Sequence, residues 1–184
     1  MKMVVIPSGF KESLSSEEVG RAIEKGINRV SSEHDVTVIP MADGGEGFVE
    51  TIVKLKQGKI IKTHVTGPVG KKIDSFFGIF YENGVKTAVI EMAAIAGLRH
   101  VPHDQRNPLY TTTYGVGETI LEAVNLEAER ILIGCGDSGT SDGGTGMAEA
   151  VGVKFYDKNN ELLNVTGGVD IGEINRVDMS EIDP

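Results

Sequence analysis

The sequence has one cysteine, Cys135, among its 184 residues and therefore no internal disulfide framework. Cys135 ends an apolar run with no basic residue beside it, a setting that predicts a buried structural thiol rather than a nucleophile. No stretch approaches the roughly 20 apolar residues that a membrane-spanning helix needs. The first apolar run is also too short for a signal peptide. These absences predict a cytoplasmic protein without a membrane partner.

Positive charge is also scarce. The chain has 18 Lys and Arg against 27 Asp and Glu, for a net charge of −9, and no basic run interrupts it. A nucleic-acid partner needs a basic patch to replace counterions. The composition therefore disfavours nucleic-acid binding and leaves a small-molecule partner as the expectation.

Glycine, by contrast, is abundant. The 24 glycines are roughly twice the share of an average protein. They cluster at residues 44–47, 115–117 and 134–146 without a collagen-like period. Clustered glycine indicates backbone that turns sharply or approaches a ligand closely.

The first third of the chain alternates short apolar strands with amphipathic helices. Residues 3–7 are typical of a buried strand, and residues 36–39 predict a second strand. Ser15 and Glu18 form a capping-box signature for a helix between these two strands. A second helix is expected from Phe48. This rhythm predicts a parallel sheet covered by helices.

The rest of the chain mixes hairpins with further strand–helix units. Residues 73–81 and 86–91 are predicted strands joined at Asn83-Gly84, a favoured hairpin turn. The other expected elements are strands at 59–65 and 130–133, helices around Val116 and at 143–151, and a second hairpin pairing 153–156 with 161–164. The tail from 166 to 184 shows no convincing last element. We predict an α/β fold with parallel-sheet, Rossmann-like portions of two domains, 1–67 and 68–184, the first of them incomplete.

One acid–glycine pattern occurs twice after a predicted strand. Residues 43–47 read Asp-Gly-Gly-Glu-Gly and residues 142–146 read Asp-Gly-Gly-Thr-Gly. Ligands in open α/β sheets bind at the carboxyl ends of strands, and helix amino termini offer N–H groups to anions. An Asp at such a point could hold Mg²⁺ or accept a proton from a hydroxyl. The alternative is that each Asp only caps a helix.

Two more polar loops are candidates. Lys11, in the loop 8–15, could reach a phosphate as a point charge, or be a solvated lysine. The threonines at 111–113 could cap a helix, bind an anion or orient a substrate. Glycines 134, 136 and 139 match the dinucleotide fingerprint formally, but Asp137 would oppose a pyrophosphate and the helix starts later than that motif requires.

These motifs together resemble the glycerate kinases of the bacterial glycerate 2-kinase type. Residues 4–15 are similar to the family's opening D-S-F-K-G-S-L-S, and residues 40–47 match P-M-A-D-G-G-E-G without a change. Residues 107–118 resemble N-P-x-x-T-T-S-Y-G-V-G-E, and residues 134–147 resemble G-I-G-G-S-A-T-N-D-G-G-A-G-M. This chain departs from those blocks inside the expected site, at Ser8, Gly9, Glu12, Asp137 and Ser141.

The resemblance implies two α/β domains with a cleft between them and transfer of the ATP γ-phosphoryl group to a hydroxyl of D-glycerate, with Mg²⁺. It implies a chain about twice as long, so that this one would act with a complementing second half or as a homo-oligomer. The alternative is a catalytically silent remnant that binds a small acid or a protein. The implied catalytic residues are Asp43, Lys11 and Asp142, with Asp43 and Asp142 as metal ligands. The implied substrate and phosphate ligands are Ser13, Gly44, Gly45, Glu46, Asn107, Thr112, Thr113 and Ser138.

Overall fold

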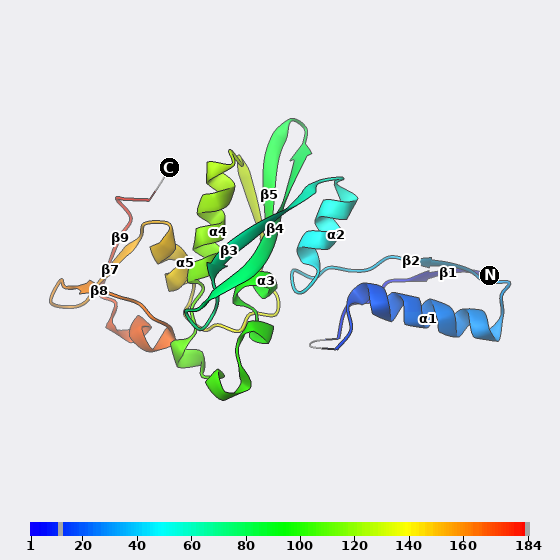
Figure 1. Ribbon diagram of the computed structural model, residues 1–184, viewed down its shortest axis with the longest axis horizontal. Helices are drawn as coiled ribbons and strands as arrows, with labels where there is room; N and C mark the ends of the chain where they lie inside the picture. The colour runs from blue at the N-terminus through cyan, green and yellow to red at the C-terminus, as the bar shows by residue number, and fades with distance from the viewer. Residues whose placement is uncertain (11–12, 183–184) are drawn as a thin grey trace.

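The structure is a computed structural model that describes residues 1–10 and 13–182 (Figure 1). The strands are β1 Lys2–Val5, β2 Asp35–Val38, β3 Lys59–Thr66, β4 Lys72–Glu82, β5 Val85–Glu91, β6 Arg130–Gly134, β7 Lys154–Tyr156, β8 Leu162–Leu163 and β9 Arg176–Asp178. The α-helices are α1 Ser16–Val30, α2 Phe48–Leu55, α3 Met92–Ala96, α4 Tyr114–Asn125 and α5 Thr145–Ala150. Short 3-10 turns are η1 Leu98–His100, η2 His103–Gln105, η3 Pro108–Tyr110 and η4 Gly168–Glu173.

The amino-terminal layer consists of β1, α1 and β2. The two strands pair in parallel, with Val4 opposite Thr37, as the βαβ pattern predicted. The expectation that the first strand is buried is wrong, since Val4 is exposed. The capping box is confirmed: Ser15 Oγ accepts the Glu18 N–H at 3.2 Å, and the Glu18 carboxylate accepts the Ser15 N–H at 2.8 Å. This layer projects from the rest of the molecule, with the chain's amino terminus at its far end (Figure 1). The carboxyl ends of both strands therefore point back toward α2.

A mixed four-stranded sheet in the order β3-β4-β5-β6 forms the central layer. The predicted hairpin is confirmed, because Asn83 and Gly84 both have positive φ, 53° and 84°, between antiparallel β4 and β5. Strands β5 and β6 run parallel. The α/β class with parallel strand pairs is thus confirmed, although this sheet also contains antiparallel pairs. Strands β3 and β4 pair across Gly67 and Pro68, and a domain division at that point stays a prediction.

Alternate residues of β4 and β5 pack against helices on opposite faces of the central sheet. Phe77 and Ile90, both 0% exposed, join Val116 of α4 in one core cluster. Phe80 and Val89 join Val49 of α2 in the other. Successive side chains of a strand point to opposite faces, so a strand that is covered on both faces needs apolar residues at both sets of alternate positions. The two faces place α2 and α4 on either side of the sheet, with their amino termini near its carboxyl edge (Figure 1).

The carboxyl-terminal segment forms a small antiparallel sheet in the order β8-β7-β9. The hairpin predicted across Asn159-Asn160 is present, with shorter strands than expected. The expectation that the tail lacks a last element is wrong, since β9 pairs with β7. The Arg176 guanidinium stacks over the Tyr156 ring, 3.7 Å from its centroid. A cross-strand contact of this kind leaves no periodic signal in the sequence.

Candidate functional site

The site lies where two parallel strands end together. Glu91, the last residue of β5, is in register with Gly134, the last residue of β6. Chain from three directions meets at this edge: the segment before α2, the turn after α3, and the segment between β6 and α5. The edge is the expected place for a ligand in an α/β sheet.

The first acid–glycine loop, residues 43–47, packs directly on the loop that follows β6. The Gly136 N–H donates to the Gly44 carbonyl at 2.7 Å. A Cβ on Gly136 would lie 2.4 Å from the Gly45 Cα, a separation that no side chain tolerates. Gly44 and Gly47 have φ of 90° and 87°, in the left-handed region that glycine enters without strain. Close backbone approach therefore explains the glycines on both sides of this contact.

Three carboxylates already occupy amide groups of this loop and of the α2 amino terminus. The Gly45 N–H donates to Asp43 Oδ1 at 3.1 Å, and the Glu46 N–H donates to Asp137 Oδ2 at 3.1 Å. The Val49 N–H donates to Glu91 Oε2 at 3.1 Å. The helix end attracts negative charge, as its dipole predicts. A phosphate or carboxylate ligand would compete with the protein's own acids for these amides.

The second acid–glycine loop, residues 142–146, is built differently. Asp142 is 1% exposed, and its Oδ2 accepts the Thr113 N–H at 2.7 Å, the Thr113 hydroxyl at 2.8 Å and the Gly146 N–H at 3.2 Å. Its Oδ1 accepts the Gly144 N–H at 3.1 Å. The Thr113 hydroxyl also accepts the Met147 N–H at 2.9 Å. Asp142 thus ties the start of α4 to the start of α5.

The remaining predicted ligands lie around these two loops, and most have local hydrogen bonds. The Asn107 side chain accepts the Leu109 N–H at 3.1 Å and so caps η3. The Thr112 hydroxyl accepts the Tyr114 N–H at 3.1 Å. Ser138 is exposed, with its hydroxyl 2.8 Å from that of Thr140. Ser13 is exposed in the turn after β1, while Lys11 and Glu12 lie outside the described residues.

The structure brings the predicted residues together in two groups rather than one. Gly44, Gly45 and Glu46 meet the loop that follows β6, whereas Thr112 and Thr113 meet residues 142–146. The stretch 138–141 connects the two groups along the chain. Among residues 1–10 and 13–182, no hydrogen bond joins Asp43 to Asp142.

Two residues that the sequence analysis did not select are part of this site. Arg99, just after α3, forms an ion pair with Glu46 of the first loop. Glu91 lies under the same loop, fully buried. Burial chiefly raises the pKa of Glu91 to about 7. The only signal for Glu91 in the sequence is an acid that closes an apolar strand, and Arg99 gives none because its partner is 53 residues away.

Two local expectations meet different outcomes. Cys135 is exposed, so the prediction of a buried thiol is wrong. It comes just after β6 ends at Gly134, and the chain there turns out of the sheet. The late helix start predicted after the formal dinucleotide fingerprint is confirmed, because α5 begins only at Thr145, and Gly136 of that fingerprint packs on protein backbone.

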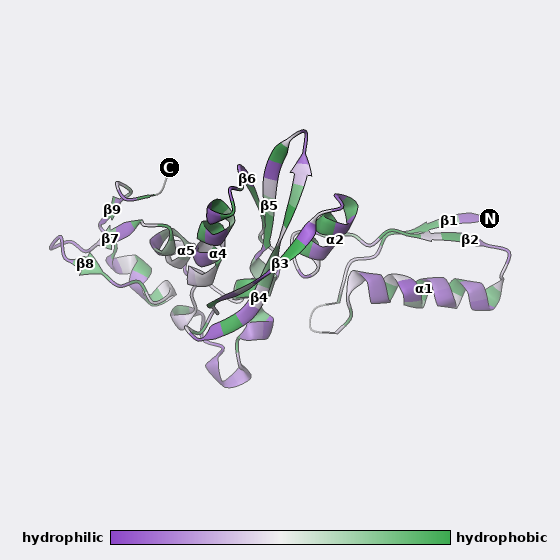
Figure 2. Cartoon of the chain, turned by 45° about the horizontal axis from the view of Figure 1, so that its top comes forward, coloured by the Kyte–Doolittle hydropathy of each residue, from purple (hydrophilic) through white to green (hydrophobic). Residues whose placement is uncertain are grey.

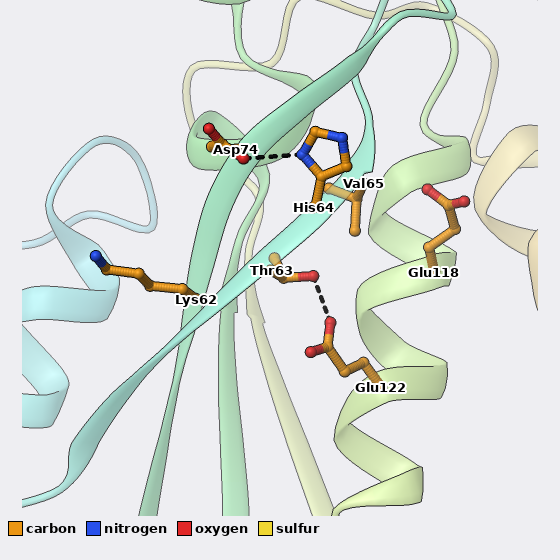
Figure 3. Close-up of a pocket in the computed structure, with 7 residues that line it drawn as sticks. All are labelled: Lys62, Thr63, His64, Val65, Asp74, Glu118 and Glu122. Atoms are coloured by element: carbon orange, nitrogen blue, oxygen red, sulfur yellow. Dashed lines mark hydrogen bonds and ion pairs between the residues drawn. The ribbon is translucent and has the colours of Figure 1, made fainter.

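A pocket of about 530 Å³ lies elsewhere, between β3, β4 and α4 (Figure 3). Its acids have partners on neighbouring elements. The Thr63 hydroxyl donates to Glu122, His64 Nδ1 lies 2.8 Å from Asp74 Oδ1, and Glu118 accepts the Thr66 N–H at 2.6 Å. Burial favours the neutral form of Glu118, but hydrogen bonds from Lys72 and Thr66 outweigh it and lower its pKa. These pairs join β3 to its neighbours, and no predicted site residue lines the pocket.

The fold and its loops define an α/β protein whose polar, glycine-rich segments gather at the carboxyl ends of strands. None of the helices among the described residues is long and apolar enough to cross a membrane. The sequence profile of the Glycerate kinase family matches residues 3–184. The chain therefore belongs to the glycerate kinase family.

Individual relatives agree with this assignment. The chain is 46% identical over 184 residues to a glycerate kinase of Haemophilus influenzae, covering 100% of this chain and 48% of the relative. It is 45% identical over 184 residues to the glycerate 2-kinase of Escherichia coli K12, with the same coverage. A solved structure assigned as glycerate kinase 2 from Salmonella typhimurium LT2 is 42% identical, with a TM-score of 0.74 over 100% of this chain and 49% of that one. The chain spans about half the length of the relatives it matches.

Proposed function

We propose that this chain forms the amino-terminal half of a kinase that transfers the γ-phosphoryl group of ATP to a hydroxyl of D-glycerate. The observation that carries the proposal is the first loop, residues 43–47. It keeps the family's motif unchanged and places an exposed Asp43 in the loop that leads into α2, beside the shared carboxyl edge of β5 and β6. Relatives that cover the whole chain carry the name glycerate kinase, which supports the choice of substrate.

Phosphoryl transfer needs positioning and charge neutralisation more than covalent chemistry. In the proposed role Asp43 accepts the proton of the attacking hydroxyl, because its carboxylate is exposed and its Oδ1 is fixed by the Gly45 N–H. Arg99 neutralises Glu46 next to that position. Thr112 and Ser138, half-buried and exposed respectively, offer hydroxyl groups to the substrate. Ser13 and Asn107 complete the proposed polar lining, and Lys11 would add positive charge to it.

Mg²⁺ would accompany ATP, and the two predicted metal ligands fit it unequally. An exposed carboxylate such as Asp43 can give one oxygen to Mg²⁺ while phosphates and waters supply the rest. Asp142 is buried and both its oxygens accept N–H or O–H donors, so binding a cation there would displace those donors. We therefore place the ion at Asp43, where it would neutralise phosphate charge. A role of Asp142 in metal binding stays a prediction.

The test is a coupled assay of ADP release with D-glycerate, ATP and Mg²⁺, run on this chain co-expressed with the remaining half of a relative. We expect Asp43→Asn to lower turnover by at least about 100-fold, since the amide cannot take the proton and offers the cation no negative charge, and to leave the protein folded. The matched control is Asp35→Asn, an exposed acid at the amino end of β2 and away from the loop. Turnover of the Asp43 variant at the wild-type rate would contradict the proposal.

We also propose that a second half completes the active protein. Apolar side chains of the amino-terminal layer are exposed, among them Val4 at 61%, Ile6 at 53% and Ile39 at 50%. They lie in β1 or just after β1 and β2, two strands that are largely green in Figure 2. Turnover that appears only when the remaining half of a relative is co-expressed would support this arrangement. Equal turnover by the chain alone would contradict it.

One observation favours the alternative, a binding protein without kinase activity. The Asp137 carboxylate occupies the Glu46 N–H and adds charge where a phosphate would lie. Calorimetry with ATP and Mg²⁺ separates the two functions, since a kinase binds the nucleotide and a sensor of small acids need not. Under the alternative, Asp137→Gly restores nucleotide binding that the parent chain lacks.

A further inference from the structure

Glu91 is a buried acid with an incomplete set of hydrogen bonds, and it lies directly beneath the first loop. None of its surface is exposed (0%). Its Oε2 accepts the Val49 N–H at 3.1 Å, whereas its Oε1 has no hydrogen-bond partner among residues 1–10 and 13–182. A buried carboxylate that lacks donors on one oxygen is costly. A proton on that oxygen would remove the charge.

The surroundings of Glu91 favour the neutral acid near neutral pH. Burial is the main cause of its raised pKa of about 7, and Glu50 of α2 raises it further. Backbone N–H groups of Val49 and Gly47, and the more distant Arg99, act in the opposite direction. On the β6 side, Gly134 lies opposite Glu91 and adds no charge. Small changes in local charge should therefore shift its protonation at physiological pH.

A ligand at the first loop would bring such a change. The α2 amino terminus carries a partial positive charge that Glu91 now partly neutralises through the Val49 N–H. A bound phosphate or carboxylate group would share this helix end with Glu91, and a negative charge close to a buried carboxylate repels it strongly. Asp137, on the neighbouring Glu46 N–H, already adds one such charge. Protonation of Glu91 is the simplest relief of that repulsion.

We propose that Glu91 is a positioning residue of the first loop that takes up one proton when an anionic ligand binds there. The proton comes from the solvent and adds to Oε1, so that the carboxyl group keeps its bond to Val49 while losing its charge. The inference rests on the proposed function, because the expected ligands are the phosphates of ATP or the carboxylate of glycerate. It adds to that function a coupling between ligand binding and pH.

The experiment is calorimetric titration of this chain, co-expressed with the remaining half of a relative, with Mg²⁺ and ATP and separately with D-glycerate. It is run at pH 7.5 in two buffers of different ionisation enthalpy. Wild type should take up a substantial fraction of one proton per ligand, and its affinity should fall up to about tenfold per pH unit above the pKa. Glu91→Gln should lose this uptake and bind with nearly constant affinity from pH 6.5 to 8.5. Asp35→Asn, an exposed acid in β2 and away from the loop, is the control that should keep it. The ligand that shows the uptake identifies which anion binds at the loop.

Proton uptake that is the same in Glu91→Gln and wild type would overturn the inference while leaving the proposed function intact. Absence of binding by either ligand would overturn both. If Glu91→Gln does not fold, ¹³C titration of glutamate carboxyl groups in the wild-type chain decides instead. A signal that titrates near pH 7 and moves upward with ligand supports the inference, and one that stays unchanged with ligand bound overturns it.

Discussion

The two acid–glycine loops share a motif but not a structure. Asp43 is exposed, and among residues 1–10 and 13–182 its side chain bonds only within its own loop, through the Gly45 N–H. Asp142 is 1% exposed and accepts four donors from the starts of α4 and α5. The same five-residue pattern therefore holds two helices together in one place and presents a carboxylate to solvent in the other.

The difference teaches that burial and the number of donors, rather than the motif, decide what an acid can do. A carboxylate whose oxygens are all bonded is part of the scaffold, because any new ligand must first replace its partners. A carboxylate held by one bond is oriented but still able to react. Four substitutions in and around the two loops test this difference through the stability of the protein.

The largest effect is expected at Asp142. Replacement by Ala leaves the Thr113 N–H and hydroxyl and the Gly146 N–H buried without their acceptor, and each such group is costly. We expect the free energy of unfolding to fall by about 4 kcal/mol, as measured by urea denaturation. Asp142→Asn should lose less, because it keeps one carbonyl oxygen. If Asp142→Ala lowered the free energy of unfolding by less than Asp43→Ala does, the second loop would not be held by Asp142.

The next largest effect is a pH dependence of the first loop through Glu91. Its folded pKa of about 7 lies above the ordinary 4.5, so its stabilising contribution is full below pH 4.5 and is lost as the pH rises through 7. The stability of wild type relative to Glu91→Gln should fall by about 3 kcal/mol across that window. Denaturation curves at several pH values measure it. If the difference in free energy of unfolding between wild type and Glu91→Gln did not change with pH, Glu91 would not be the group that titrates.

A smaller effect is expected where the first loop meets the chain after β6. A Cβ on Gly136 would lie 2.4 Å from both the Cα and the N of Gly45, so that Gly136→Ala forces the two backbones apart. We expect a loss of about 2 kcal/mol and a weaker response of the loop to ligands. Gly172→Ala is the control, because nothing lies within 4 Å of its added Cβ. Equal melting temperatures for the two variants would argue against the close contact.

The smallest effect is expected at Asp43. Asp43→Ala removes one local bond from an exposed loop and should change the free energy of unfolding by no more than about 0.5 kcal/mol. Thermal melting beside Asp142→Ala tests the contrast between the loops directly. Similar losses for both variants would abolish the distinction.

Local chemistry made much of the fold predictable. The positive φ of Asn83 and Gly84 and the reciprocal bonds of Ser15 and Glu18 follow from residue types a few positions apart. Apolar period and turn residues likewise predicted most of the strands. The Asp-Gly-Gly pattern pointed correctly to loops that follow strands and precede helices.

The unpredicted features depend on contacts between distant residues. Glu46 meets Arg99, and Val49 meets Glu91, across 53 and 42 positions of sequence. Strand β9 gains its place only by pairing with β7. Neither period nor propensity reports such pairings, which arise when the layers pack. The contrast between Asp43 and Asp142 belongs to this class, since only packing buries one of them.

The order of strands in the central sheet has a consequence for how the chain reaches its structure. Strands β3, β4 and β5 form a meander in which each strand pairs with the next along the chain, through short turns. Such contacts close little chain and form quickly, whereas β1 must find β2 across an entire helix. The meander is therefore the natural nucleus of folding. The layer that carries β1 and β2 would form after the meander.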